Sequence, residues 1–346
     1  MAGWQDRRVL VTGHTGFKGS WLCETLLGRG ARVAGLALPP EGSLAFFDQL
    51  GLAGRLDHAV VDLRDAGAVA ARVAQVAPDV VFHLGAQSLV QRSYAKPVET
   101  WATNVLGTVH LLDALAALAR PVAVVVVTTD KVYENREWVH GYRETDRLGG
   151  HDPYSASKAA AEIAVDSWRK SFGGLRIATA RAGNVIGGGD WAENRILPDL
   201  ARAFAKGQPL AVRNPDSVRP FQHVLEPLAG YMTLAERLIG SDDPKWQSAF
   251  NFGPEPGDLM TVRNLVTAAV ESWPGTWVDV SDPTARHEAG QLSLTIDKAR
   301  SDLGWSPHWD IKRGLAETIG WYRQAAEGAD VGQLTRAQIA AHKAGR

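Results

Sequence analysis

Two side chains with complementary acid–base properties, Tyr154 and Lys158, stand four residues apart at the start of a predicted helix, Ser155–Phe172. This spacing puts them on one face of the helix. A tyrosine hydroxyl has a pKa of about 10, and a neighbouring ammonium group favours the phenolate and lowers that pKa. Tyr154 is therefore predicted to accept the proton of a substrate hydroxyl while hydride leaves the same carbon. The alternative is a chance pair on an exposed helix.

A second group of polar residues follows the apolar segment Val122–Thr128, which is predicted to be a buried strand. Open α/β sheets bind ligands at the carboxyl ends of their strands, so Thr129 could hold the reacting oxygen. Asp130 and Lys131 add an acid and a base. A ketone acidifies the proton on the neighbouring carbon, which Lys131 could remove if burial lowers its pKa, while Asp130 protonates a leaving hydroxyl. A solvated Asp-Lys pair at the start of a loop is the alternative.

A glycine-rich turn, Gly13-x-x-Gly16-x-x-Gly19, follows the predicted strand Arg8–Thr12 and opens the predicted helix Ser20–Gly28. Glycines permit a tight turn and let the backbone approach a pyrophosphate, which then lies at the positive end of the helix. An ordinary strand–helix turn is the alternative. The position at the first strand of an alternating chain favours a dinucleotide site.

The residues around this turn do not separate NAD from NADP, because the second strand ends at Leu38 with neither an acid nor an arginine. Asp62 could contact the adenine end of the cofactor or cap a helix. Asn104 could orient Lys158 through water, or it could have a buried capping role, and Lys158 could bind the nicotinamide ribose. The residues predicted to contact the cofactor are Gly13, Thr15, Gly16, Phe17, Lys18, Gly19, Asp62, Leu63, Leu84, Gly85, Ala86, Asn104, Thr128, Tyr154 and Lys158.

The order of the predicted elements indicates an α/β fold, a Rossmann-type doubly wound parallel sheet with a smaller, partly interleaved C-terminal substrate-binding region. Residues 1–190 are expected to bind the dinucleotide, residues 191–330 mainly the substrate, and residues 331–346 to form a polar tail whose end frays. The predicted strands are Arg8–Thr12, Arg32–Leu38, His58–Val61, Asp79–Leu84, Val122–Thr128 and Arg176–Ala182. The predicted helices are Ser20–Gly28, Thr103–Leu118, Ser155–Phe172, Ile196–Lys206, Pro227–Leu238, Met260–Ser272 and most of Ile311–Arg346.

Composition narrows the class of protein. The chain has 346 residues and a net charge of −1, so no basic field favours nucleic acid or a membrane surface. The single cysteine, Cys23, allows no internal disulfide and is expected to lie in the core. No signal peptide or membrane span is expected, no metal site is predicted, and a cytoplasmic location is favoured.

Six segments resemble the extended short-chain dehydrogenase/reductase family, and within it the nucleotide-sugar 4,6-dehydratases. These segments are Val11–Leu22, Gly85–Tyr94, Asp130–Glu137, Leu148–Tyr154, Ala182–Trp191 and Arg219–Glu226. The pair Asp130-Lys131 is similar to the CDP-glucose branch, whereas the dTDP-glucose branch carries Asp-Glu. Gly85 and Ser88 stand where alanine and proline are expected, and Val132 where cysteine is frequent, which leaves the sugar and base preference open.

The resemblance implies NAD, tightly bound and regenerated in each turnover, and CDP-glucose as the nucleotide-sugar substrate. It implies oxidation at carbon 4, loss of water across carbons 5 and 6, and hydride return to carbon 6. The product would be CDP-4-keto-6-deoxyglucose, a precursor of deoxy sugars in surface polysaccharides. A homo-oligomer, dimer or tetramer, paired through Thr103–Leu118 and Ser155–Phe172, is also implied. The residues implied to contact substrate are Gln87, Asn184, Arg195, Arg213 and Arg219.

Guanidinium groups match phosphate oxygens, which fits the implied role of Arg195 and Arg219, with Asn184, at the diphosphate, although a surface ion pair is the alternative for Arg195. Arg213 is a candidate for contact with the base or ribose. A nucleotide-sugar 4-epimerase would need Thr129, Tyr154 and Lys158 but no acid and base for elimination. A 4,6-dehydratase for another nucleotide-sugar, or a silent NAD-binding regulatory protein, are further alternatives.

Overall fold

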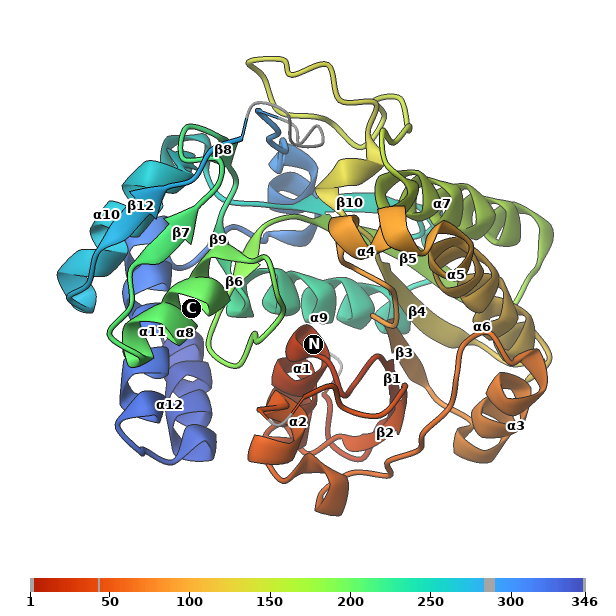
Figure 1. Cartoon of the computed structure of the whole chain (residues 1–346). Helices are drawn as coiled ribbons and strands as arrows, with labels where there is room; N and C mark the ends of the chain where they lie inside the picture. The colour runs from red at the N-terminus through yellow and green to blue at the C-terminus, as the bar shows by residue number, and fades with distance from the viewer. Residues whose placement is uncertain (1–2, 43, 283–289, 345–346) are drawn as a thin grey trace.

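The computed structural model describes residues 3–42, 44–282 and 290–344 of the chain (Figure 1). At its centre is a six-stranded sheet in the order β10-β5-β4-β3-β1-β2, in which all neighbouring strands are parallel. This is the predicted doubly wound, Rossmann-type sheet. Its strands are β1 (Arg8–Thr12), β2 (Arg32–Leu36), β3 (Val80–His83), β4 (Val122–Val127), β5 (Leu175–Ala182) and β10 (Ala249–Phe252).

Helices cover both faces of the sheet and build the C-terminal region (Figure 1). The α-helices are α1 (Phe17–Leu27), α2 (Phe46–Gln49), α3 (Ala66–Val76), α4 (Val90–Ala95), α5 (Pro97–Trp101), α6 (Gly107–Ala116), α7 (Pro153–Ser171), α8 (Ile196–Ala205), α9 (Leu225–Gly240), α10 (Val262–Ser272), α11 (Ile311–Ala326) and α12 (Val331–Ala344). Short 3₁₀ turns are η1 (Leu52–Gly54), η3 (Asp130–Val132), η4 (Pro244–Trp246) and η5 (Pro256–Asp258), and π-helical turns are η2 (Ala102–Leu106) and η6 (Ala299–Leu303).

Alternate residues of the central strands enter two separate cores. Val124 and Val126 of β4 pack in one core with residues of α3, α6 and α7, whereas Val125 and Val127 pack in the other with residues of α1 and α9. Successive side chains of a strand point to opposite faces, so a strand covered on both faces must be apolar throughout. This requirement explains the unbroken run of valines and alanine in β4, all buried.

Two sequence predictions of strands need correction. His58–Val61 forms no strand: this part of the chain meets β2 and the residue after it only through two isolated bridges, Ala34 with Asp57 and Ala37 with Val60. The guanidinium of Arg72 also donates to the carbonyl oxygen of Asp57. The sixth strand, β10, was not predicted from its four residues, which a Gly-Pro pair follows. The predicted helix Thr103–Leu118 is divided, since η2 gives its first residues a π-helical turn before α6.

The C-terminal region has a third core and three small two-stranded sheets, and it is interleaved with the main sheet through β10 and α9. Its short strands are β6 (Val185–Ile186), β7 (Leu210–Val212), β8 (Val218–Arg219), β9 (Gln222–His223), β11 (Met260–Thr261) and β12 (Trp277–Asp279). They pair as β6 with β9, β7 with β12 and β8 with β11.

The segment expected to be a polar tail forms helix α12, which lies beside α11 and α1 (Figure 1). The buried ring of His342 bonds through Nε2 to Oε1 of Glu226 at 2.8 Å, and the indole of Trp321 donates to Thr335 at 3.2 Å. Arg336 also pairs with Glu24 of α1 at 3.4 Å. Val331, Leu334 and Ile339 of α12 also pack against the core on the α1 face, so both polar and apolar contacts hold this helix on the fold. Within the described ranges, no helix is long and apolar enough to cross a membrane.

Candidate active site

The start of α7 brings the predicted acid–base pair to the carboxyl end of β4. Asp152 caps α7 by accepting a hydrogen bond from the backbone N–H of Ser155 at 2.9 Å, and Pro153 occupies the first turn. Tyr154 and Lys158 are both buried, at 8% and 5% exposure. Lys158 Nζ donates to the carbonyl oxygen of Val127, the last residue of β4, at 2.9 Å. The helix start and the strand end are therefore joined directly at the site.

The pKa of Tyr154 differs from the sequence prediction. Burial raises it to about 12, although a hydrogen bond between its hydroxyl and Thr129 and the charge of Arg195 act in the opposite direction. The prediction of a pKa lowered by Lys158 was wrong in sign, because removal from water outweighs the nearby charges. Burial lowers the pKa of Lys158 itself to about 8, against the opposing effect of Glu162.

The carboxylate of Asp130 is buried beside Thr129, and its Oδ1 accepts a hydrogen bond from the Thr129 hydroxyl at 2.9 Å. Its other oxygen, Oδ2, has no hydrogen-bond partner among the described residues. This oxygen lies against the turn after β5, where a Cβ on Gly183 would come within 1.9 Å of it. Only glycine therefore leaves room for Asp130 in this position. Lys131 is half-buried, and within the described residues its ammonium group has no hydrogen bond or ion pair.

The glycine turn is built for close approach of backbone. Gly13 has a φ of +71°, and a Cβ there would lie 2.7 Å from the backbone N of Gly85. A Cβ on Gly19 would lie 2.2 Å from the carbonyl oxygen of Gly13. Gly16 is the N-cap of α1 and offers no side-chain cap, so the first N–H groups of the helix stay open to an acceptor. These features fit a dinucleotide pyrophosphate.

Gly85, where the resemblance led us to expect alanine, is the partner of this turn. Its N–H donates to the hydroxyl of Thr12 at 3.0 Å, and a Cβ would come within 2.7 Å of Leu63. The turn residue Thr15 donates to the carbonyl oxygen of Leu38 at 3.0 Å. The β1 and β3 loops, both expected to contact the cofactor, are thus packed against each other.

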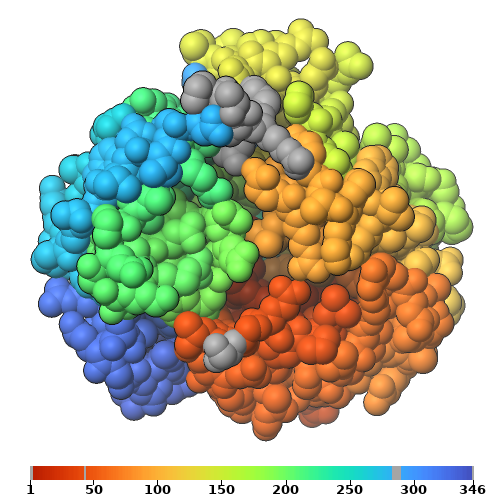
Figure 2. All heavy atoms as spheres, in the orientation of Figure 1, coloured from red at the N-terminus to blue at the C-terminus, as the bar shows by residue number. Residues whose placement is uncertain are grey.

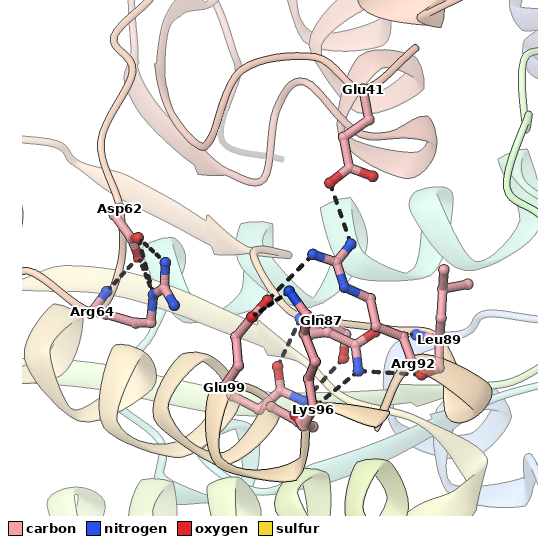
Figure 3. A network of polar contacts seen from close by, with 10 residues as sticks. Glu41, Asp62, Arg64, Gln87, Leu89, Arg92, Lys96 and Glu99 are labelled. Carbon is pink, nitrogen blue, oxygen red and sulfur yellow. Dashed lines mark hydrogen bonds and ion pairs between the residues drawn. The ribbon is translucent and has the colours of Figure 1, made fainter. Parts of the chain in front are cut away.

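Asn104 lies in the π-helical turn η2 and ties the loop after β3 to α7. Its Oδ1 accepts from the N–H of Gln87 at 2.8 Å, and its Nδ2 donates to the carbonyl oxygen of Gln87 at 3.0 Å and to Ser157 at 2.9 Å. The structure therefore shows the buried bonding role for Asn104. The side-chain amide of Gln87 is itself engaged with Leu89 and Thr100 (Figure 3).

Asp62 is not a helix cap. Its carboxylate binds the guanidinium of Arg64, whose hydrogen bond holds the pKa of Asp62 below its ordinary value, and Asp65 caps α3 instead (Figure 3). Figure 3 also shows two ion pairs of Arg92 of α4. Its guanidinium lies 3.4 Å from the carboxylate of Glu41, in the segment after β2, and 3.2 Å from that of Glu99 of α5. The segments after β2 and β3 therefore approach each other at this edge.

Of the predicted substrate residues, Gln87 lies in the loop after β3, whereas the other four come from the opposite side of the same edge. Arg195, the N-cap of α8, pairs with Asp190 at 2.8 Å, and its charge acts on Tyr154 and on the half-buried Lys18. Burial, with the charge of Arg195 next, lowers the pKa of Lys18 to about 8. Arg195 thus belongs to the site, although it also makes the ion pair considered from the sequence. Figure 2 shows the surface hollowed between the orange region around α4 and the green region around α8.

The remaining substrate candidates lie further along this side. Asn184 has a φ of +44° in the turn after β5, and its carbonyl oxygen accepts from Gln222. Arg213 donates to the side chain of Asn194 at 2.8 Å and is exposed. Arg219 of β8 donates to the carbonyl oxygen of Gly290 at 3.2 Å.

Sequence reasoning missed three buried residues of the site, Gly183, Glu162 and Arg181. Glu162 follows Lys158 by four residues on α7, a spacing that was visible in the sequence, whereas its partner Arg181 comes from β5. Thr128 is predicted to contact the cofactor, but its hydroxyl donates a hydrogen bond to Glu162 at 2.5 Å. A contact with the cofactor would therefore have to come from other atoms of Thr128. No group of three or more metal-ligating side chains occurs in the described ranges.

The parallel sheet, the glycine turn and the arrangement of Thr129, Tyr154 and Lys158 fit the class of dinucleotide-dependent oxidoreductases. The chain belongs to the NAD dependent epimerase/dehydratase family, whose model matches residues 9–251. The predicted cofactor, NAD, is that of this family.

Curated relatives match over nearly the whole chain. The CDP-glucose 4,6-dehydratase of Salmonella typhimurium is 43% identical over 338 residues, which cover 95% of this chain and 94% of that protein. The dTDP-glucose 4,6-dehydratase of Streptomyces antibioticus is 32% identical, with 91% and 92% covered.

Solved structures share the fold. The dTDP-glucose 4,6-dehydratase DesIV of Streptomyces venezuelae, solved with NAD bound, has a TM-score of 0.79 and 28% identity, covering 91% of this chain and 97% of that chain. A UDP-glucose 4-epimerase of Thermotoga maritima has a TM-score of 0.81 at 22% identity, covering 92% and 99%, and supports the fold alone.

Proposed function

We propose that this protein is an NAD-dependent hydro-lyase that converts CDP-glucose to CDP-4-keto-6-deoxyglucose. The observation that carries the proposal is the buried carboxylate of Asp130, with one unbonded oxygen, followed in sequence by Lys131 and bonded to Thr129. An enzyme that only oxidises and reduces carbon 4 needs no such acid and base. The 43% identity to a CDP-glucose 4,6-dehydratase supports the choice of substrate.

The first step is oxidation at carbon 4, for which Tyr154 takes the proton of the hydroxyl while Thr129 holds its oxygen. Because the pKa of Tyr154 is about 12 in its buried setting, this transfer depends on positive charge at the site. Lys158 on the same helix face and Arg195 across the hollow supply that charge. Bound NAD supplies the acceptor for the hydride from carbon 4 and the donor for its return.

The second step eliminates water across carbons 5 and 6. Lys131, acting as a neutral amine, takes the proton from carbon 5, and the electron pair of that bond forms the new double bond. Asp130, acting as a carboxylic acid, gives the proton of its unbonded Oδ2 to the leaving hydroxyl of carbon 6. After hydride returns to carbon 6, Lys131 gives its proton back to carbon 5. Tyr154 releases the proton that it took from the carbon 4 hydroxyl, and Asp130 takes up one proton, so every group recovers its starting form.

The cofactor fits the glycine turn, because Gly13 and Gly19 leave the space that any Cβ would fill and α1 begins without a side-chain cap. Across the hollow, Arg195, Arg213, Arg219 and Asn184 would hold the nucleotide diphosphate and base.

We further propose a cytoplasmic homo-oligomer, dimer or tetramer, whose product enters surface polysaccharide synthesis. Large apolar side chains are exposed in the two segments expected to pair, Leu106 (53%) in η2 and Ile163 (61%) on α7. Val98 (81%) and Trp101 (42%) are exposed on the neighbouring helix α5. Such side chains lose water contact when two copies pack together. Light scattering of the purified protein would measure the number of copies.

The test of the reaction is incubation of the purified protein with NAD and, separately, CDP-, dTDP-, UDP- and GDP-glucose, followed by mass spectrometry. We expect loss of one water from CDP-glucose. Loss of water from another nucleotide-sugar alone would reassign the substrate. An isomer of unchanged mass would instead favour a 4-epimerase, and no turnover of any substrate would contradict the proposed activity.

A further inference from the structure

Beneath the site lies a buried ion pair that none of the proposed steps uses. Glu162 of α7 and Arg181 of β5 each have side chains only 4% exposed. Arg181 donates through Nε to Oε1 of Glu162 and through Nη2 to Oε2, both at 3.0 Å. This two-point geometry is the strong form of a guanidinium–carboxylate contact.

Two threonine hydroxyls complete the shell of this carboxylate. Thr128 donates to Oε1 at 2.5 Å and Thr179 donates to Oε2 at 2.7 Å, so each oxygen accepts two hydrogen bonds. Taking two charges out of water is costly, and a buried ion pair is often no more stabilising than apolar side chains of the same volume. Stability of the sheet alone therefore does not account for Glu162.

The contacts of Glu162 suggest another role, because they lie next to the reacting groups. The end of β4 is bound to α7 at two consecutive residues: Val127 accepts from Lys158 at 2.9 Å, and Thr128 donates to Glu162 at 2.5 Å. The following residue is Thr129, whose hydroxyl bonds to that of Tyr154 and to Asp130. Any slip of Thr128 along α7 would displace Thr129 as well.

We propose that Glu162 is a positioning residue. Its bond to Thr128 fixes Thr129 against Tyr154, and its place one helical turn after Lys158 on the same face of α7 puts a negative charge beside that ammonium group. The proposal rests on the oxidation step described above. Arg181 has a supporting part, since it neutralises the carboxylate and fixes its orientation from β5.

The electrostatic setting of Lys158 supports this role. Burial lowers the pKa of Lys158 to about 8, and Glu162 is the carboxylate of the described residues whose charge opposes that effect. The charge of Lys158 also lowers the pKa of two other groups, His83 of β3 and Lys18 of α1. Burial is the main cause at His83, whose pKa is about 3, so its ring is neutral. Glu162 itself faces Arg181, and Arg169 on its own helix. Without Glu162, Lys158 would lose its proton nearer to neutral pH.

A matched pair of variants tests the positioning. Thr128→Val and Thr179→Val each remove one buried hydroxyl from Glu162, but only Thr128 adjoins Thr129. We expect similar decreases in thermal midpoint, a kcat at least tenfold lower for Thr128→Val with little change in KM, and a nearly unchanged kcat for Thr179→Val. An equal effect of the two variants on kcat would overturn the positioning role.

Glu162→Gln tests the charge. Two quantities should each decrease by about one pH unit: the pH above which kcat falls, and the pH above which NAD affinity, measured by calorimetry, declines. In Thr128→Val, the pH above which kcat falls should be the same as in the wild-type protein. The double variant Glu162→Gln/Arg181→Met removes both charges and serves if the single variant does not fold. If Glu162→Gln changes neither the pH dependence of kcat nor the pH dependence of NAD affinity, the inference is overturned. If the wild-type protein fails to convert CDP-glucose, the NAD profile alone still decides it.

Discussion

Gly183→Ala is expected to damage elimination while sparing the fold. A Cβ at residue 183 would lie 1.9 Å from Oδ2, 2.1 Å from Cγ and 2.5 Å from Oδ1 of Asp130. All three carboxyl atoms are closer than the 3.0 Å below which real Cβ atoms are essentially never found, so the acid must move by about 1 Å or more. A displacement of about 1 Å from the reactive geometry can cost about 100-fold in rate. We therefore expect dehydration to slow by about two orders of magnitude.

A single-turnover experiment separates the two steps of this variant. A Cβ at residue 183 meets the side chain of Asp130 and not Tyr154 or Lys158, and Thr129 loses only its bond to that carboxylate. CDP-glucose should therefore still reduce bound NAD. The absorbance of reduced nicotinamide should persist, while water loss, followed by mass spectrometry, is slow. Gly173→Ala is the control, since a Cβ there meets nothing within 4 Å. Dehydration by Gly183→Ala at the rate of this control would refute the assignment of Asp130 as the acid.

Three further substitutions or conditions test the site. Tyr154→Phe removes the proton acceptor of the first step, so no reduced nicotinamide should form with CDP-glucose; normal turnover would refute that role. Lys131→Ala should leave nicotinamide reduction intact but slow exchange of the carbon 5 proton with deuterated solvent by about 100-fold or more, and unchanged exchange would exclude Lys131 as the base. Burial lowers the pKa of His14 to about 4 and of His83 to about 3, so the unfolded chain binds more protons than the folded chain below the ordinary histidine pKa of about 6.5. The free energy of unfolding should therefore decrease as pH falls from about 6.5 towards 4 in urea titrations, and His83→Gln should reduce this slope; an equal slope would contradict the burial argument.

Local patterns in the sequence were enough to predict the elements that carry the site. The alternation of strands and helices indicated the sheet, and the glycine spacing and the interval between Tyr154 and Lys158 placed the turn and the helix start. These features depend on neighbours within a few residues, so a sequence displays them directly.

Features that depend on tertiary packing were not predictable in the same way. The pKa of Tyr154 rises because distant segments exclude water from it, and this effect outweighs the hydrogen bond with Thr129 and the charge of Arg195. The need for glycine at 183 comes from Asp130, which lies 53 positions earlier in the chain. The sequence analysis considered Asp62 as a helix cap, but its carboxylate binds Arg64, and Asp65 caps α3.

The last two helices of the described chain, α11 and α12, pack into the same core as α1, so the two ends of the chain must meet during folding. The core on the α1 face combines Trp21 with Trp321 and Tyr322, side chains that lie 300 residues apart in sequence. During synthesis the glycine turn emerges first, yet the apolar face of α1 has no complete cover until α11 and α12 leave the ribosome. Contacts of such long sequence separation slow folding and leave hydrophobic surface open in the meantime. The dinucleotide-binding half therefore exposes apolar surface during synthesis until α11 and α12 have docked.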